Sequence, residues 1–187
     1  MQNVSFLNEL ISAYEKKVSL VALNQRQSKE AIFFTIQKLL ERNENIIVVA
    51  LAMPAQEIVD KFPGKNVFVI DAFSRDTQKE TQNIFFASNQ SSLTTIQIGI
   101  EKFSKTVNAN KTIIFDSLSM LSVYNTERDL GRFIYYFSNK TRLNDDSCIF
   151  FAVKDAIEEN VLVTAQQLCD KYYDYSNIFV ESIEAVK

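Results

Sequence analysis

Residues 18–40 read VSLVALNQRQSKEAIFFTIQKLL and pass from a strand pattern to a helix pattern. The first six residues form a continuous apolar run, which is typical of a strand buried on both faces of a sheet. From Ile32 to Leu40, apolar residues recur at helical spacing. Between the two lies the turn LNQRQSKE, residues 23–30, with a lysine near its end. The stretch predicts a strand, a short turn and a helix, the repeating unit of a parallel α/β fold.

The same alternation continues along the chain. Further apolar runs predict strands at residues 46–51, 67–72, 112–116, 148–153 and 178–183, with a short edge piece at 84–87. Apolar residues at helical spacing predict helices at residues 32–40, 58–62, 93–103, 130–137 and 165–172. Thr126 is placed to cap the fourth of these helices. We therefore expect an α/β protein, a three-layer α/β/α sandwich with a mainly parallel sheet.

The chain is expected to form a single domain over residues 1–187, because no linker, repeat or low-complexity segment interrupts it. Within residues 1–15, apolar side chains share one helical face and predict a short docking helix. No segment has the length of a membrane span or the pattern of a signal peptide. A cytoplasmic protein without membrane contact is the expectation.

The composition excludes several kinds of chemistry. The sequence has no histidine, so Ser-His-Asp and Cys-His catalysis and histidine-bound zinc are ruled out, and no metal site is expected. Cys148 and Cys169 do not form a CxxC pair and are interpreted as buried structural thiols. The formal net charge of −3 provides no electrostatic reason to expect a nucleic-acid partner.

A carboxylate ends the strand predicted at residues 112–116, in the stretch TIIFDSLS. Ligands of parallel sheets bind beyond the carboxyl ends of the strands, so Asp116 and Ser117 face the usual ligand edge. Asp116 could hold magnesium beside a nucleotide, because hard cations prefer oxygen ligands. It could equally end the strand and accept hydrogen bonds from its own loop.

The segment IIFDSLSML, followed by YNTERDLGRFIYYFSNK, resembles the second nucleotide-binding segment of the RecA/KaiC-like ATPases. The preceding SSLTTIQIGIEKF and the later QQLCDKYYDY also match the layout of that family, so the resemblance covers roughly residues 15–183 as a pattern. It implies a RecA-like sheet in which strand 148–153 lies between strands 18–23 and 112–116. It also implies relatives that act as hexamers or filaments.

By position, LNQRQSKE stands where the family has GxxxxGK followed by Ser or Thr. Leu23 and Ser28 replace the glycines, Lys29 matches the lysine, and Glu30 replaces the hydroxyl residue. A phosphate loop needs inward-facing backbone amides and glycines that permit left-handed angles. The resemblance therefore implies an inactivated member of the family.

The residues of the lost site are then expected to find other partners. Near the start of the helix, the carboxylate of Glu30 could accept free amide hydrogens, and Lys29 could pair with Glu30 or Asp116 or point to water. The vestigial nucleotide-binding residues are Ser28, Lys29, Glu30, Asp116 and Ser117.

The strand end at residues 50–54, ALAMP, lacks the water-activating glutamate that the family carries there. The first acid that follows is Glu57, inside the next predicted helix. No catalytic residue and no cofactor are therefore expected, although weak binding of Mg-ATP stays open.

Two further groups of polar residues are expected to have structural roles only. Asp71 is expected to cap its loop or to pair with Arg75. The basic residues near the fourth predicted helix are expected on a solvated face: Arg128, Arg132, Lys140 and Arg142.

Three functions remain open from sequence. The first is a non-catalytic interaction or signalling module whose partner is a protein, either a second copy in a homo-oligomer or an active ATPase relative. The second is a divergent ATPase in which Lys29, Glu30 and Asp116 still bind magnesium nucleotide. The third is a nucleic-acid accessory similar to recombinase paralogues.

Overall fold

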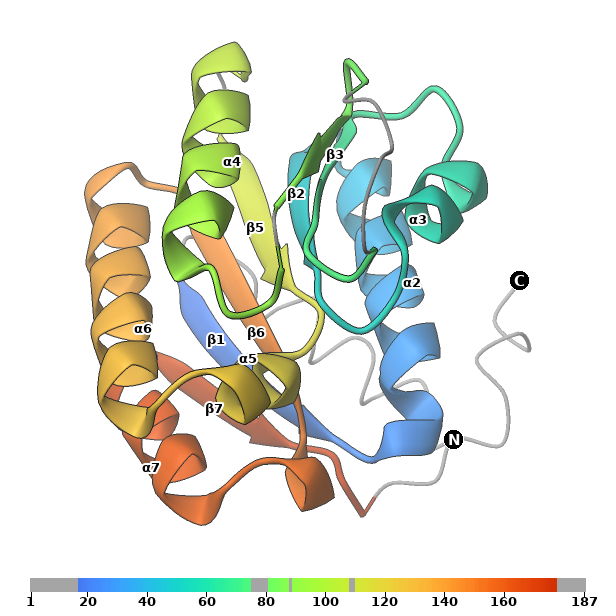
Figure 1. Cartoon of the computed structure of the whole chain (residues 1–187). Helices are drawn as coiled ribbons and strands as arrows, with labels where there is room; N and C mark the ends of the chain where they lie inside the picture. The colour runs from blue at the N-terminus through green and yellow to red at the C-terminus, as the bar shows by residue number, and fades with distance from the viewer. Residues whose placement is uncertain (1–16, 75–80, 88, 108–109, 178–187) are drawn as a thin grey trace.

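The computed structural model describes residues 17–74, 81–87, 89–107 and 110–177. Seven strands in this part of the chain form one sheet, and all six pairings between neighbouring strands are parallel. The strands are β1 (Val18–Leu23), β2 (Asn45–Ala50), β3 (Val67–Asp71), β4 (Ile84–Phe86), β5 (Lys111–Phe115), β6 (Ser147–Val153) and β7 (Lys171–Asp174). Their order across the sheet is β4-β3-β2-β5-β6-β1-β7, so β6 lies between β1 and β5 as predicted (Figure 1).

Six α-helices of the described chain cover the two faces of the sheet (Figure 1). On one face lie α2 (Gln25–Glu41) and α3 (Ala55–Lys61). On the other lie α4 (Leu93–Thr106), α5 (Leu118–Tyr124), α6 (Glu127–Leu143) and α7 (Glu159–Leu168), with the short 3₁₀ turn η1 (Lys154–Ala156) before α7. This arrangement confirms the predicted three-layer α/β/α sandwich.

The strands read as continuous apolar runs because both of their faces are buried. In β1, every residue is buried, with Leu20 packed toward α6 and α7 and Val21 packed toward α2. Parallel strands between two helical layers have this property, since neither face meets water.

Aromatic rings fill the centre of the layer under α6. The Phe115 ring stacks on Phe150 at a centroid distance of 4.7 Å and meets Phe133 and Phe137 edge-on at 5.6 Å each. Phe115 is fully buried, and it directly precedes Asp116 at the end of β5. The cluster therefore anchors the strand end from which the candidate site is built.

The carboxyl-terminal part of the fold differs from the sequence-based expectation. The helix predicted to reach Tyr172 ends at Leu168, and Tyr172 lies in the edge strand β7. That strand has only four residues, three of them exposed, so it lacks the apolar run by which the other strands are recognised. Helix α5 was also not predicted. The docking helix expected within residues 1–15 and the strand expected at 178–183 fall outside the described residues.

Candidate functional site

Helix α2 begins one residue after β1 ends. Asn24 is the only residue between them, with φ −82° and ψ 158°, and its side-chain oxygen accepts a hydrogen bond from the amide of Gln27 at 3.1 Å. Residues 25–30 of the stretch LNQRQSKE are therefore helical, and Asn24 is the N-cap. The strand is joined to the helix by a cap rather than by a loop that could curve around a ligand.

Lys29 lies in the second turn of α2 and forms an ion pair with Glu57 of α3. Its ammonium group also lies 5.9 Å from the ring centroid of Phe33. The expectation that Lys29 pairs with Glu30 or Asp116 is wrong, because α3 places Glu57 beside it, while its side chain, 53% exposed, still reaches water as the third alternative expected. Two helices on the same face of the sheet are thus joined at the carboxyl edge.

Glu30 does not play the role expected from sequence. The first turn of α2 contains no acidic residue, because Glu30 falls in the second turn. Glu30 is exposed. The amide hydrogen of Gln27 is instead accepted by Asn24. The prediction that Glu30 accepts free amide hydrogens at the helix start was wrong because the helix begins earlier than the family pattern implies.

Asp116 is almost completely buried at the end of β5. Its Oδ1 accepts the amide of Leu51 at 2.8 Å, and its Oδ2 accepts the amide of Ala52 at 3.1 Å. Both oxygens thus bind the backbone that follows β2. Burial raises the pKa of this carboxyl group to about 7, and the charge of Asp71 acts in the same direction, against the lowering effect of the backbone amides at residues 51–53.

Two neighbouring polar groups are also used by local structure. Ser117 is the N-cap of α5, and its hydroxyl accepts the amide of Met120 at 3.2 Å. Asp71 accepts the amides of Ala55 and Phe73, each at 2.9 Å, so it ties the end of β3 to the start of α3. The expectation that Asp71 caps its loop is confirmed, while Arg75 falls outside the described residues.

Lys29, Asp116 and Ser117 line a depression of about 170 Å³ at the carboxyl edge of the sheet, and Asp71 is not part of its lining. Its lining comes from α2, α3, α5 and the strand ends: Ser28, Lys29, Ile32, Ala52, Met53, Pro54, Glu57, Asp116, Ser117 and Val153. Pockets for small molecules and cofactors usually measure about 300–1,000 Å³. The depression is therefore smaller than the sites that bind a nucleotide-sized ligand.

Four of the five residues predicted from sequence come together in this depression, namely Ser28, Lys29, Asp116 and Ser117. Glu30 is not part of its lining. Glu57 also lines the depression, and the sequence analysis did not identify it as the partner of Lys29. No signal in the sequence joins the two, because they are brought together only when α2 and α3 pack on the same face.

Solved structures with the same fold were found, although no protein-family model and no curated protein matches the sequence. The uncharacterized protein PH0321 from Pyrococcus horikoshii, solved with an unknown peptide, has a TM-score of 0.67 at 12% identity, over 92% of this chain and 82% of that chain. The solved ATPase domain of another protein has a TM-score of 0.58 at 12% identity, over 96% of this chain and 85% of that domain.

A DnaB-like replicative helicase, described with its interactions with primase, has a TM-score of 0.54 at 11% identity. The match covers 80% of this chain and 46% of the helicase chain, so the chain spans less than half of that protein. The fold is RecA-like. At these identities the likeness concerns the fold, and function has to be argued from the site.

The described part of the RecA-like domain contains no group of three or more His, Cys, Asp and Glu side chains that could hold a metal ion. None of its described helices has both the length and the apolar character needed to cross a membrane.

The protonation of Asp116 is expected to make the RecA-like domain more stable as the pH falls from about 8 to about 5.5, by roughly 2 kcal/mol. The carboxyl pKa is about 7 in the folded protein and near its ordinary value of 3.8 in the unfolded chain. The folded state therefore binds more protons across this range, and its stability rises as protons are added.

Urea denaturation at several pH values measures this effect. The side chain of Asp116→Asn cannot titrate. In this variant we expect the free energy of unfolding not to show the rise attributed to Asp116 over the same pH range. An equal rise in the wild type and in Asp116→Asn would show that another group is responsible.

Proposed function

We propose that this chain is a non-catalytic RecA-like domain that serves as an interaction or signalling module. The observation that carries the proposal is the junction of β1 and α2, where a single cap residue, Asn24, takes the place of a phosphate-binding loop. The depression nearby is lined by the side of α2, at Ser28, Lys29 and Ile32. The first three residues of α2, Gln25 to Gln27, are not part of its lining, so the usual anion site of a helix start is not directed into it.

The remaining parts of a nucleotide site are engaged in holding the fold. Both oxygens of Asp116 accept hydrogen bonds from backbone amides. If Asp116 held magnesium instead, the amides of Leu51 and Ala52 would lose their acceptor. Lys29 forms an ion pair with Glu57, so an anionic ligand would have to compete with that carboxylate for the lysine. These contacts support a domain whose structure is retained without nucleotide chemistry.

A role in binding other proteins is supported by the distribution of exposed apolar side chains. Nine large apolar residues of the described surface are exposed, and six of them lie on α5, α6 and α7. They are Val123, Tyr124, Tyr135, Tyr136, Leu143 and Val163. None of the nine lies on α2 or α3. Since tyrosine is enriched in protein interfaces, the α5–α7 side is the better candidate for a partner surface.

The known relatives of the fold support the same role by analogy. The PH0321 structure contains an unknown peptide, and the helicase structure describes interactions with primase. We infer that the partner of this chain is a protein, either a second copy or an active ATPase relative.

Calorimetric titration with Mg-ATP and Mg-ADP tests the proposal. We expect no saturable heat up to millimolar nucleotide, in the wild type and in Lys29→Ala alike. An active ATPase with an intact phosphate loop, titrated under the same conditions, shows that binding would be detected.

The divergent-ATPase alternative is favoured by one observation, the convergence of Lys29, Asp116 and Ser117 on one depression. It requires stoichiometric Mg-ATP binding that weakens in Lys29→Ala and in Asp116→Asn. That result would replace the non-catalytic proposal with an enzyme.

A further inference from the structure

Strand β7 is paired on one side only. It lies at the end of the described sheet and runs parallel to β1, with Lys171 opposite Ser19 and Asp174 opposite Ala22. Three of its four residues are exposed, and Tyr173 is half-buried. Every residue of β1 is buried. The edge strand therefore shields β1 from water while it buries few side chains of its own.

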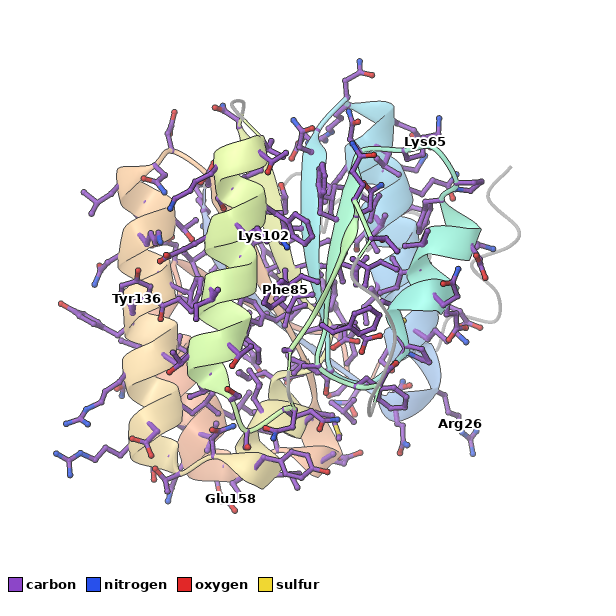
Figure 2. The ribbon with its side chains drawn as sticks, turned by 45° about the horizontal axis from the view of Figure 1, so that its top comes forward. Arg26, Lys65, Phe85, Lys102, Tyr136 and Glu158 are labelled. Atoms are coloured by element: carbon purple, nitrogen blue, oxygen red, sulfur yellow. The ribbon has the colours of Figure 1, made fainter. Side chains whose placement is uncertain are left out.

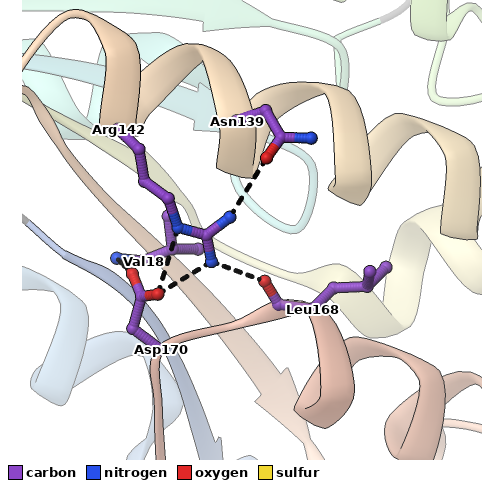
Figure 3. Close-up of polar contacts among 5 residues, drawn as sticks. All are labelled: Val18, Asn139, Arg142, Leu168 and Asp170. Carbon is purple, nitrogen blue, oxygen red and sulfur yellow. Dashed lines mark hydrogen bonds and ion pairs between the residues drawn. The ribbon is translucent and has the colours of Figure 1, made fainter.

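A group of polar contacts fixes the start of β7, as Figure 3 shows. Nε and Nη2 of Arg142 donate to Oδ1 of Asp170 at 3.1 Å and 2.8 Å. Oδ2 of Asp170 accepts the amide of Val18 at 2.8 Å. Nη2 of Arg142 also donates to the carbonyl of Leu168 at 3.0 Å. Arg142 is thus exposed, as expected from sequence, but its guanidinium group joins α6 to the segment that leads into β7.

A second ion pair fixes the other end of the strand. Nζ of Lys154, in η1, lies 2.5 Å from Oδ2 of Asp174, the last residue of β7. Oδ1 of Asp174 accepts the amide of Ser176 at 3.1 Å. Tyr175 is buried, and its amide donates to the carbonyl of Ala22 at 2.8 Å. An acid at each end and an aromatic ring after the second acid are therefore the side chains that hold β7 in place.

Both ion pairs are partly open to solvent. The side chains of Arg142 and Asp170 are 39% and 33% exposed, and those of Lys154 and Asp174 are 37% and 32% exposed. Ion pairs at such sites stabilise weakly and are screened by salt. Segments with few buried contacts also open at a lower free energy than the core of a fold. We therefore expect β7 to leave the sheet more readily than the central strands.

We propose that β7 is a detachable cover over a strand-binding edge of β1, and that this edge binds an extended peptide with the side-chain pattern of β7 itself. The pattern is an acid, three further residues, a second acid and an aromatic residue, as in Asp170, Asp174 and Tyr175. In strand addition, main-chain hydrogen bonds provide affinity and side chains provide specificity. Arg142 and Lys154 belong to α6 and η1, so they remain in place to pair with the acids of the incoming strand.

The inference rests on the proposed function only in that the partner is a protein. Neither Arg142, Lys154 nor any residue of β7 lines the depression beside α2. The peptide experiment and the nucleotide titration therefore test separate parts of the molecule. If no peptide binds and no nucleotide binds, the strand-binding edge is rejected and the non-catalytic domain stands.

Fluorescence anisotropy with a labelled peptide of residues 170–177 tests the proposal on the full chain. In Asp170→Asn/Asp174→Asn, the strand of the protein loses both acidic charges, whereas Arg142 and Lys154 stay available to the peptide. We expect this variant to bind the peptide at least about fivefold more tightly than the wild type does. A peptide that carries the same two substitutions should bind the variant about fivefold more weakly than the natural sequence does.

Glu158→Gln/Glu159→Gln is the matched control, because it also removes two exposed acids. Both residues lie at the start of α7 and form no ion pair within the described chain. Figure 2 labels Glu158 at the lower edge of the molecule. This variant is expected to bind the peptide as the wild type does. Circular dichroism checks that both variants keep the fold.

The proposal is overturned if neither protein binds the peptide at several hundred micromolar, or if the wild type and Asp170→Asn/Asp174→Asn bind it equally well. Equal binding of the two peptides would reject the role of the acids. Hydrogen exchange provides an independent measurement of detachment. The amides of residues 171–174 are expected to exchange faster than those of β6, and faster again in Asp170→Asn/Asp174→Asn. Exchange as slow as that of β6 would show that β7 is not a detachable strand.

Discussion

Phe115→Ala is expected to lower the free energy of unfolding by about 4 kcal/mol. The ring is fully buried and contacts three others, Phe133, Phe137 and Phe150, at centroid distances of 4.7–5.6 Å. Removing it deletes the apolar surface and leaves a cavity that neighbouring strands of a parallel sheet cannot close. Urea denaturation followed by circular dichroism measures the loss.

Phe33→Ala is the matched control for this prediction. Its ring is only partly buried and meets one other ring, Phe62, at 6.0 Å. We expect a loss of about 1 kcal/mol, because a half-buried side chain removes less surface from water. Similar losses for the two variants would mean that the aromatic cluster under α6 contributes no more than a surface contact.

Asp116→Ala is expected to destabilise the fold by about 3 kcal/mol at pH 6. The substitution leaves the buried amide of Leu51 without an acceptor and also removes the acceptor of the part-buried amide of Ala52. The loss should be smaller at pH 8, since the wild-type carboxyl group is then ionised at a cost that the variant does not carry. Urea denaturation at both pH values measures the two losses.

Two further substitutions define what the Asp116 result means. Asp116→Asn keeps the shape and one acceptor oxygen, so it should recover about half of the lost stability. Asp60→Ala removes an exposed aspartate whose side chain accepts a hydrogen bond from Gln56, and its effect should stay within about 0.5 kcal/mol. If Asp116→Ala were as mild as Asp60→Ala, the carboxylate would be free for another task, such as holding a metal ion.

Most of the strands could be predicted because their environment imposes a simple pattern. Strands β1 to β6 were predicted to within one residue at each end, since burial on both faces requires continuous apolar runs. Strand β7 was missed because an edge strand with exposed residues such as Lys171 and Asp174 needs no such run. Helix α5 was missed because residues 117–119 were interpreted as the loop that follows the strand end at Asp116, whereas Ser117 is the N-cap of a seven-residue helix.

The candidate site was predicted in part. Lys29 and Asp116 follow strands that end at the same edge of the sheet, so their presence in one depression could be expected. The start of α2 at Gln25 could not, because the choice between a loop and a cap depends on how Asn24 is held against the helix. The absence of glycine from residues 23–30 is visible in the sequence, whereas the helical conformation of residues 25–30 is not.

Local patterns of apolar residues were enough to specify the layered α/β architecture and the first six strands, and the composition excludes histidine chemistry. The partners of the polar groups, in contrast, depend on the packed fold. Lys29 pairs with Glu57, and Asp116 with the backbone after β2, because packing brings together groups that are distant in the chain. A buried or half-buried polar group binds the nearest complementary group in space, and sequence distance does not report that proximity.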